Sequence, residues 1–132
     1  MKYRLQFLVL LATLMLVWLA GCGAGGSDVS AAVAVEDYLQ SQVNKDLNRM
    51  ISLSCADWEE AARLEYNALA ALTVSLDNPD CRVTQQDGET ALVSCNGNMV
   101  FNYGTEVLEK ALADLVYRVV NDGGVWLVCG YQ

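Results

Sequence analysis

The side chains from Ala91 to Tyr103 alternate in character along the chain. Odd positions are apolar or small, whereas Ser94, Asn96 and Asn98 at even positions are polar. Successive side chains of a strand point to opposite faces of a sheet, so this pattern is typical of a long antiparallel strand with one face buried. A buried sheet face must be covered, and the remaining segments have to supply that cover.

The segment before this strand begins with a helical pattern near Ser30. Apolar residues recur every three or four positions, which places them on one face of a helix. They are Val35, Leu39, Val43, Leu47 and Met50. We expect residues 44–46 to bend or re-cap this helix, because Asn and Asp prefer caps and turns to helix interiors.

A second helix is predicted from Ala56 to about Leu72. Ser54 is the expected N-cap, and acidic residues in the first turns suit the positive end of the helix dipole. The apolar face of this helix is expected to consist of Ala61, Leu64, Ala68, Leu69 and Leu72.

The remainder of the chain is predicted to form strands. Residues 108–120 are ambiguous, since Leu108, Leu112 and Leu115 also fit a helix face, but 115–120 is strongly β-forming and favours a strand. The expected strands are 73–86 with an interruption at 77–80, then 91–103, 108–120 and 125–131, the last two joined by a turn at 121–124. The fold class is therefore α+β, with N-terminal helices packed on an antiparallel four-stranded sheet.

The N-terminal segment is typical of an export signal. Lys2 and Arg4 precede an apolar run over 5–19, as in secretory leaders. Leu19-Ala20-Gly21-Cys22 resembles the lipobox of bacterial lipoproteins, in which the cysteine takes lipid and becomes the first mature residue. A membrane-spanning anchor and a plain secretory signal are the alternatives, but the run is short for a span.

The resemblance to lipoproteins implies a division of the chain. Residues 1–21 would be the signal peptide, 22–29 a flexible tether and 30–132 one domain. Cys22 would carry the lipid, so we expect a protein outside the cytoplasm, anchored to the cell membrane or the outer membrane of a bacterium.

Four further cysteines, Cys55, Cys81, Cys95 and Cys129, are an even number, which predicts two disulfides in an oxidising compartment. Three pairings are possible. A turn centred on Gly88 sets Cys81 opposite Cys95 and leaves Cys55 for Cys129. The chain has no histidine and no Cys-x-x-Cys pair, so we expect no metal site and no cofactor.

Acidic residues outnumber basic ones by sixteen to eight, for a net charge of −8. Such a charge repels phosphate backbones and anionic lipid, which disfavours nucleic acid as a partner. Contact with a membrane would therefore come from the lipid on Cys22.

The order of two helices followed by a strand meander resembles the NTF2-like, or cystatin-like, α+β fold. The segment from Tyr117 to Tyr131, with an Asp-Gly turn and Trp126 on the last strand, looks like the end of small secreted NTF2-like lipoproteins of the DUF4878 type. This resemblance implies a curved sheet that wraps its helices as a cone. The superfamily includes enzymes and binding modules, so it does not fix a function.

Enzymes of this fold place carboxylates, tyrosines or histidines inside the cone. The candidates in this chain are Tyr38, Tyr66, Tyr103, Tyr117 and Asp114, and none matches a catalytic motif. We therefore expect a non-catalytic binding or interaction module; the alternative is a small-molecule isomerase or hydro-lyase that uses a carboxylate and tyrosines.

A ligand pocket is expected between the first helix and the strand 91–103. Its predicted lining is Leu39, Val43, Met99, Phe101, Tyr103 and Tyr117. The expected partner is a small apolar ligand in this pocket or another protein of the cell envelope.

Overall fold

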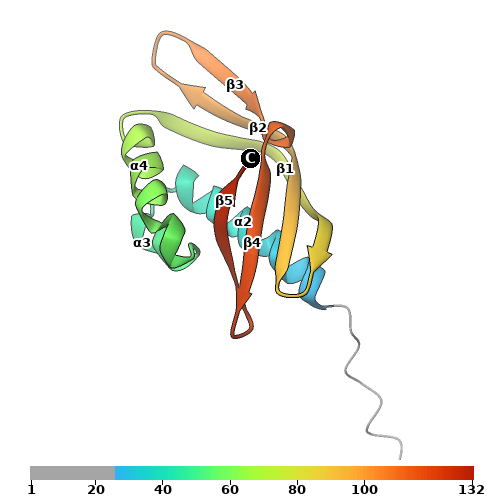
Figure 1. Cartoon of the computed structure of the whole chain (residues 1–132). Coiled ribbons are helices and arrows are strands. Elements are labelled where there is room, and N and C mark those ends of the chain that lie inside the picture. Colours follow the sequence, from blue (N-terminus) through green and yellow to red (C-terminus); the bar gives the residue numbers. More distant parts are fainter. Residues whose placement is uncertain (1–25) are drawn as a thin grey trace, which may run out of the picture.

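The computed structural model describes residues 26–132, so the leader and Cys22 lie outside the described residues. Helices precede a five-stranded antiparallel sheet, as Figure 1 shows. The elements are α2 (Gly26–Val43), α3 (Leu47–Ser52), the 3-10 turn η1 (Ala56–Trp58), α4 (Glu59–Leu69), β1 (Thr73–Asp87), β2 (Thr90–Asn102), β3 (Val107–Ala111), the 3-10 turn η2 (Leu112–Asp114), β4 (Val116–Asp122) and β5 (Val125–Tyr131). The predicted α+β fold class is confirmed.

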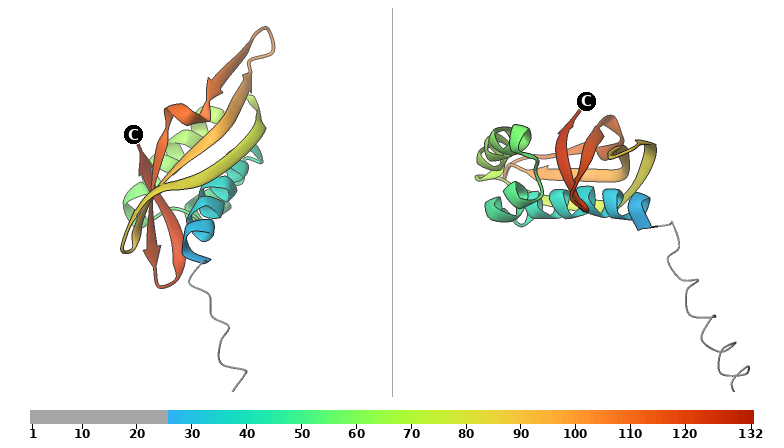
Figure 2. Two further views of the ribbon diagram at one scale, coloured as in Figure 1. Left: turned by 90° about the vertical axis from the view of Figure 1, so that its right-hand side faces the viewer. Right: turned by 60° about the horizontal axis from the view of Figure 1, so that its bottom comes forward.

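The helix α2 lies across one face of the curved sheet, with α3 and α4 beside its C-terminal end (Figure 2). Val35, Tyr38 and Leu39 are fully buried against the sheet, as expected from the helical period. The helix α2 includes residues 26–29, which belong to the segment 22–29 that is expected to be a tether.

The predicted bend at residues 44–46 separates α2 from α3. Lys45 adopts a left-handed backbone conformation (φ 54°), which ends α2. The Arg49 N–H donates to Asp46 Oδ1 (3.0 Å), so the Asp46 side chain caps α3.

The second helix is shorter than predicted, and Ser54 is not its cap. Ser54 lies opposite Val128 of β5 in an isolated parallel bridge, which holds the chain extended at this point. Its hydroxyl donates to the Met50 carbonyl (2.8 Å) instead. The chain then passes through η1 into α4, where Ala62 is fully buried and Leu64 is 63% exposed. Ala68 is exposed as well, so the predicted apolar face is wrong at Leu64 and Ala68.

The sheet has five strands rather than the predicted four. The segment 108–120 is not one strand: β3 pairs with the C-terminal half of β2, η2 buries Leu112, and β4 pairs with the N-terminal half of β2. The edge of β2 opposite β1 therefore pairs with β3 along one half and with β4 along the other. The strand order is β1-β2-β4-β5, with β3 beside β2. A strand pattern continues on both sides of η2, which is why periodicity alone missed the break.

The long hairpin of β1 and β2 is bent near its middle. The predicted interruption at 77–80 is a bulge inside β1, between Asp77 and Asp80. Opposite it, Gly97 of β2 has φ 93°, and a Cβ there would clash with backbone oxygens of Asp77 and Asn78. The bulge and the glycine together let the sheet curve around the helices.

Two disulfides cross-link these elements, in the pairing expected from the sequence. Cys81 and Cys95 lie opposite each other in the β1–β2 register, with Cα atoms 4.0 Å apart. Cys55 and Cys129 join the segment before η1 to β5, with Cα atoms 5.3 Å apart.

Candidate functional site

A cavity of about 170 Å³ lies where the C-terminal end of α2, α4 and the C-terminal half of β2 meet. Most of its wall is apolar, formed by Leu69, Met99, Phe101, Leu112 and Leu115. Its polar side chains are Gln42, Glu65, Lys110, Tyr117 and Tyr131. We call it the Glu65 cavity, because this residue places a carboxylate in the wall.

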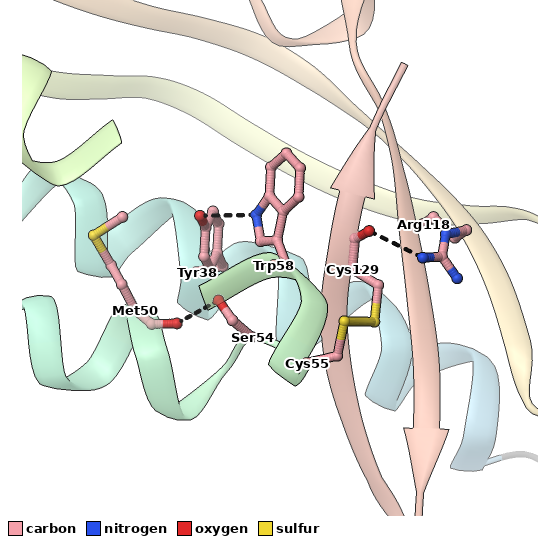
Figure 3. The surroundings of a disulfide bond; sticks show 7 residues. All are labelled: Tyr38, Met50, Ser54, Cys55, Trp58, Arg118 and Cys129. Carbon is pink, nitrogen blue, oxygen red and sulfur yellow. Dashed lines mark hydrogen bonds between the residues drawn. A yellow bond between two sulfur atoms is a disulfide. The ribbon is translucent and has the colours of Figure 1, made fainter. Parts of the chain in front are cut away.

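The Glu65 carboxylate accepts hydrogen bonds from two side chains of α2. The Tyr38 hydroxyl donates to Glu65 Oε2 (2.6 Å), and Gln42 Nε2 donates to the same oxygen (2.9 Å). Tyr38 in turn accepts a hydrogen bond from Trp58 Nε1 (3.3 Å), as Figure 3 shows. This chain of contacts fixes the carboxylate on α4 relative to α2 and η1.

Three tyrosines near Glu65 are held in their neutral form. Burial, and after it the Glu65 charge, raises the pKa of Tyr38 well above its ordinary value. The same two causes raise the pKa of Tyr117, and they raise that of Tyr131 to about 12. These hydroxyls therefore act as hydrogen-bond donors at any ordinary pH.

The rings of Tyr117 on β4 and Tyr131 on β5 close one side of the cavity. Tyr117 and Tyr131 pack edge to face with ring centroids 5.6 Å apart. Trp58 packs on Tyr131 in the same way, with ring centroids 5.4 Å apart, and this arrangement is one that aromatic pairs favour. Tyr117 is 2% exposed, whereas Tyr131 is 40% exposed. Tyr131 is therefore the accessible member of this aromatic group.

The structure brings Met99, Phe101 and Tyr117 of the predicted lining together in the cavity wall. Leu39 is fully buried in the core and Val43 packs at its edge, so neither lines the cavity. Tyr103 follows β2 and is 48% exposed. Tyr38 is a buried support of the site, while Asp114 is exposed at the end of η2.

Sequence reasoning missed Glu65, Gln42 and Tyr131. A signal for Glu65 was present, because it lies three residues after Ala62 and four before Leu69 and so shares their helix face. A carboxylate on the packed face of a helix has to meet donors in the interior.

The Cys55–Cys129 disulfide lies beside the supports of the site, as Figure 3 shows. Cys55 precedes η1, which carries Trp58, and the Cys55 N–H donates to the Val128 carbonyl (2.9 Å). Arg118 donates to the carbonyl of Cys129 (3.1 Å). The disulfide thus fixes the start of η1 and α4 on β5.

Within residues 26–132, the structure holds no group of three or more histidine, cysteine or acidic side chains that could bind a metal ion. In the same part of the chain, no helix is both long and apolar enough to cross a membrane.

Neither a family model nor a curated protein matches this sequence. Solved structures do match the fold. A candidate dehydratase of the NTF2-like family from Streptomyces avermitilis is similar over 78% of this chain and 91% of its own, with a TM-score of 0.59 and 15% identity. A protein of unknown function with a cystatin-like fold from Nostoc punctiforme is similar over 79% of this chain and 86% of its own, with a TM-score of 0.52 and 12% identity.

A third similar structure is RPA3114 from Rhodopseudomonas palustris, a protein that contains a SEC-C motif. It covers 78% of this chain and 80% of its own, with a TM-score of 0.54 and 10% identity. The chain therefore has the NTF2-like, or cystatin-like, fold, and at these identities the likeness concerns the fold alone.

Proposed function

We propose that this chain is a bacterial lipoprotein whose NTF2-like domain binds a small, mainly apolar molecule in the Glu65 cavity outside the cytoplasm. The domain acts as a binding module and not as a catalyst. The observation that carries the proposal is the cavity itself, an apolar hollow with one carboxylate held in its wall. Pockets of this composition, with few oriented polar groups, are typical of ligand sites.

The size of the hollow supports a small ligand. A dry apolar cavity of about 150 Å³ admits benzene, and the Glu65 cavity has a volume of about 170 Å³. A ligand with one ring or one branched chain therefore fits, with a donor group directed to Glu65.

The anchoring part of the proposal depends on residues outside the described structure. Leu19-Ala20-Gly21-Cys22 resembles a lipobox, and the two disulfides are typical of proteins that fold outside the reducing cytoplasm. The membrane is thus reached through lipid on Cys22, with the domain on the extracytoplasmic side.

Fatty-acid labelling tests the anchor. The full chain is expressed in a bacterium with a radiolabelled fatty acid, beside the Cys22→Ser variant. We expect label and membrane association in the first and neither in the second. Equal labelling of both chains, or release of the unaltered protein into the medium, would contradict the anchor.

A cavity-filling variant tests ligand binding. Cyclohexanol, a small ring with one hydroxyl donor, is titrated into the full chain while NMR signals of Leu115 and Phe101 are followed. Ala68→Phe adds a ring at the cavity wall and should abolish the shifts. Asn67→Phe adds the same ring at an exposed position of α4 outside the cavity lining and should leave the shifts unchanged.

If the NMR shifts persist in Ala68→Phe, cyclohexanol binds outside the Glu65 cavity. An absence of shifts in the unaltered protein would contradict a binding role for this cavity.

A second candidate function is an isomerase or hydro-lyase. The observation that favours it is the half-buried Glu65 carboxylate beside the hydroxyl of Tyr131, a pair able to exchange protons with a bound substrate. One structure of the same fold is a candidate dehydratase. Mass spectrometry of small molecules captured by the protein distinguishes the two functions. Loss of one water from a captured molecule, or its conversion to an isomer that chromatography separates, favours the enzyme if Glu65→Gln abolishes it. Recovery of the molecule with unchanged mass and retention favours the binding module.

A further inference from the structure

We infer that the ligand of the Glu65 cavity is a small zwitterion with an apolar body, such as a free amino acid with an aliphatic side chain. The inference rests on the proposed binding function and adds to it the chemical class of the ligand. It is carried by the two opposite charges in the cavity wall and by the apolar side chains that form most of the rest of that wall.

The negative end of the site is Glu65. Both hydrogen bonds from α2, donated by Tyr38 and Gln42, end on Oε2. The carboxylate is thus oriented from the side of α2, and Oε1, which takes neither of these two bonds, can accept a hydrogen bond from a ligand. An ammonium group is the strongest such donor, because a hydrogen bond between two charged groups is about twice as strong as a neutral one.

The positive end of the site is Lys110, an exposed residue of β3 that also lines the cavity. Its ammonium group is flexible and accessible, which suits it to bind a carboxylate at the mouth. Among the described residues that line the cavity, Glu65 and Lys110 are the carboxylate and the ammonium.

These two charges do not neutralise each other. The ion pairs among the described side chains are Arg49–Asp37 and Arg82–Asp80, so Glu65 and Lys110 lie beyond ion-pair distance of one another. Most of the remaining wall is apolar, with Leu69, Phe101 and Leu115. A ligand that joins them therefore needs a cation, an anion and an apolar group on one small body.

Ligands with a single charge satisfy only one end of this site. A simple amine meets Glu65 but is opposed by Lys110, and a simple carboxylate meets Lys110 but is opposed by Glu65 and by the net charge of −8. A zwitterion meets both charges and brings no net charge of its own.

The test compares four probes of similar shape. Each is titrated by calorimetry into the protein purified after expression of the full chain in a bacterium. They are leucine, 3-methylbutylamine, 4-methylpentanoate and the neutral 4-methylpentanamide. We expect leucine to bind about tenfold more tightly than either singly charged probe, because one charged hydrogen bond contributes about that factor.

Two variants assign the charges to the ends of the ligand. Glu65→Gln should weaken leucine about tenfold and leave 4-methylpentanoate unchanged or tighter. Lys110→Gln should weaken leucine about threefold, less because this side chain is exposed, and leave 3-methylbutylamine unchanged or tighter. Arg82→Gln removes an exposed positive charge of β1 outside the cavity and should change neither affinity.

Each outcome is decisive. Equal affinity for all four probes, with binding blocked by Ala68→Phe, overturns the zwitterion and leaves the binding function in place. A preference for the amine or the carboxylate alone also overturns it. Failure of every probe to bind overturns both the inference and the proposed function for ligands of this size.

Discussion

The two ends of β2 have the same alternating sequence pattern but different surroundings. At the N-terminal end Ala91, Val93 and Cys95 are buried beneath α2, and the interior is filled. At the C-terminal end α2 has ended and the shorter α4 takes its place, so Met99 and Phe101 face the Glu65 cavity. The comparison teaches that one strand forms core where a helix covers it fully and a binding site where the cover is incomplete.

Removal of the disulfides should have the largest effect on stability and should differ most between the two ends of β2. The Cys55–Cys129 bridge closes a sequence separation of 74 residues and the Cys81–Cys95 bridge one of 14. By loop entropy, replacing each pair by alanine should cost about 4.5 and about 3 kcal/mol of unfolding free energy, respectively. Urea unfolding measures both.

The same two variants should also differ in ligand binding. Loss of Cys55–Cys129 frees η1 and α4 and should reduce cyclohexanol binding, whereas loss of Cys81–Cys95 at the filled end should spare it. A reversed order in stability or in binding would contradict the assignment of each bridge to its end.

A pair of leucines compares the packing of the two ends directly. Leu39 is fully buried at the filled end, so Leu39→Ala should lower the unfolding free energy by about 3 kcal/mol. Leu69 is half-buried and already borders the cavity, so Leu69→Ala should cost only about 1 kcal/mol. Equal losses in urea unfolding would show that the open end is packed as tightly as the filled one.

The hydrogen bond behind Glu65 gives a smaller effect. Tyr38→Phe removes the donor to Glu65 and leaves the Trp58 N–H without its acceptor. The loss should cost about 2 kcal/mol of unfolding free energy, because a buried polar group is left unpaired. Tyr103 is 48% exposed and serves as the control, since Tyr103→Phe should change stability by less than about 0.5 kcal/mol. Thermal unfolding of both variants distinguishes a supporting contact from an incidental one.

Alkaline pH should produce the smallest of these effects. Burial, followed by the Glu65 charge, raises the pKa of Tyr117 in the folded state, while the unfolded tyrosine ionises near a pH of about 10. The folded state therefore keeps a proton that the unfolded state loses, and stability is constant below about pH 10 and falls above it.

The comparison of pH 9 with pH 11 isolates this contribution. In urea unfolding, Tyr117→Phe should lose about 1 kcal/mol less than the unaltered protein over that interval. An identical loss in both proteins would mean that Tyr117 takes no part in the alkaline transition.

The parts of the fold predicted from sequence depend on neighbours close along the chain. The alternation around Val93 and Cys95, the turn at Gly88 and the helix break at Lys45 are all local signals, and the structure contains each of them. The break of 108–120 into β3, η2 and β4 is not local, because β3 and β4 pair with different halves of β2. The position of Ser54 likewise depends on β5, far along the chain.

The residues of the site also divide into those predicted from local patterns and those that depend on distant contacts. Met99 and Phe101 were predicted from alternation, since a strand pattern places them on the inner face. Glu65 depends on Tyr38 and Gln42, which lie 27 and 23 residues away in sequence. No period along α4 shows that a carboxylate will meet these two donors, so the contacts that hold Glu65 could not be predicted from the sequence.

The division of one edge of β2 between β3 and β4 has a consequence for native-state opening. Among the described strands, β3 pairs only with β2, and Val107 and Leu108 on it are more than half exposed. This segment buries little apolar surface. It should therefore open without global unfolding and exchange its amide hydrogens faster than β4. Because Lys110 belongs to β3, each such opening carries one wall of the Glu65 cavity away and provides a route for a ligand to enter or leave.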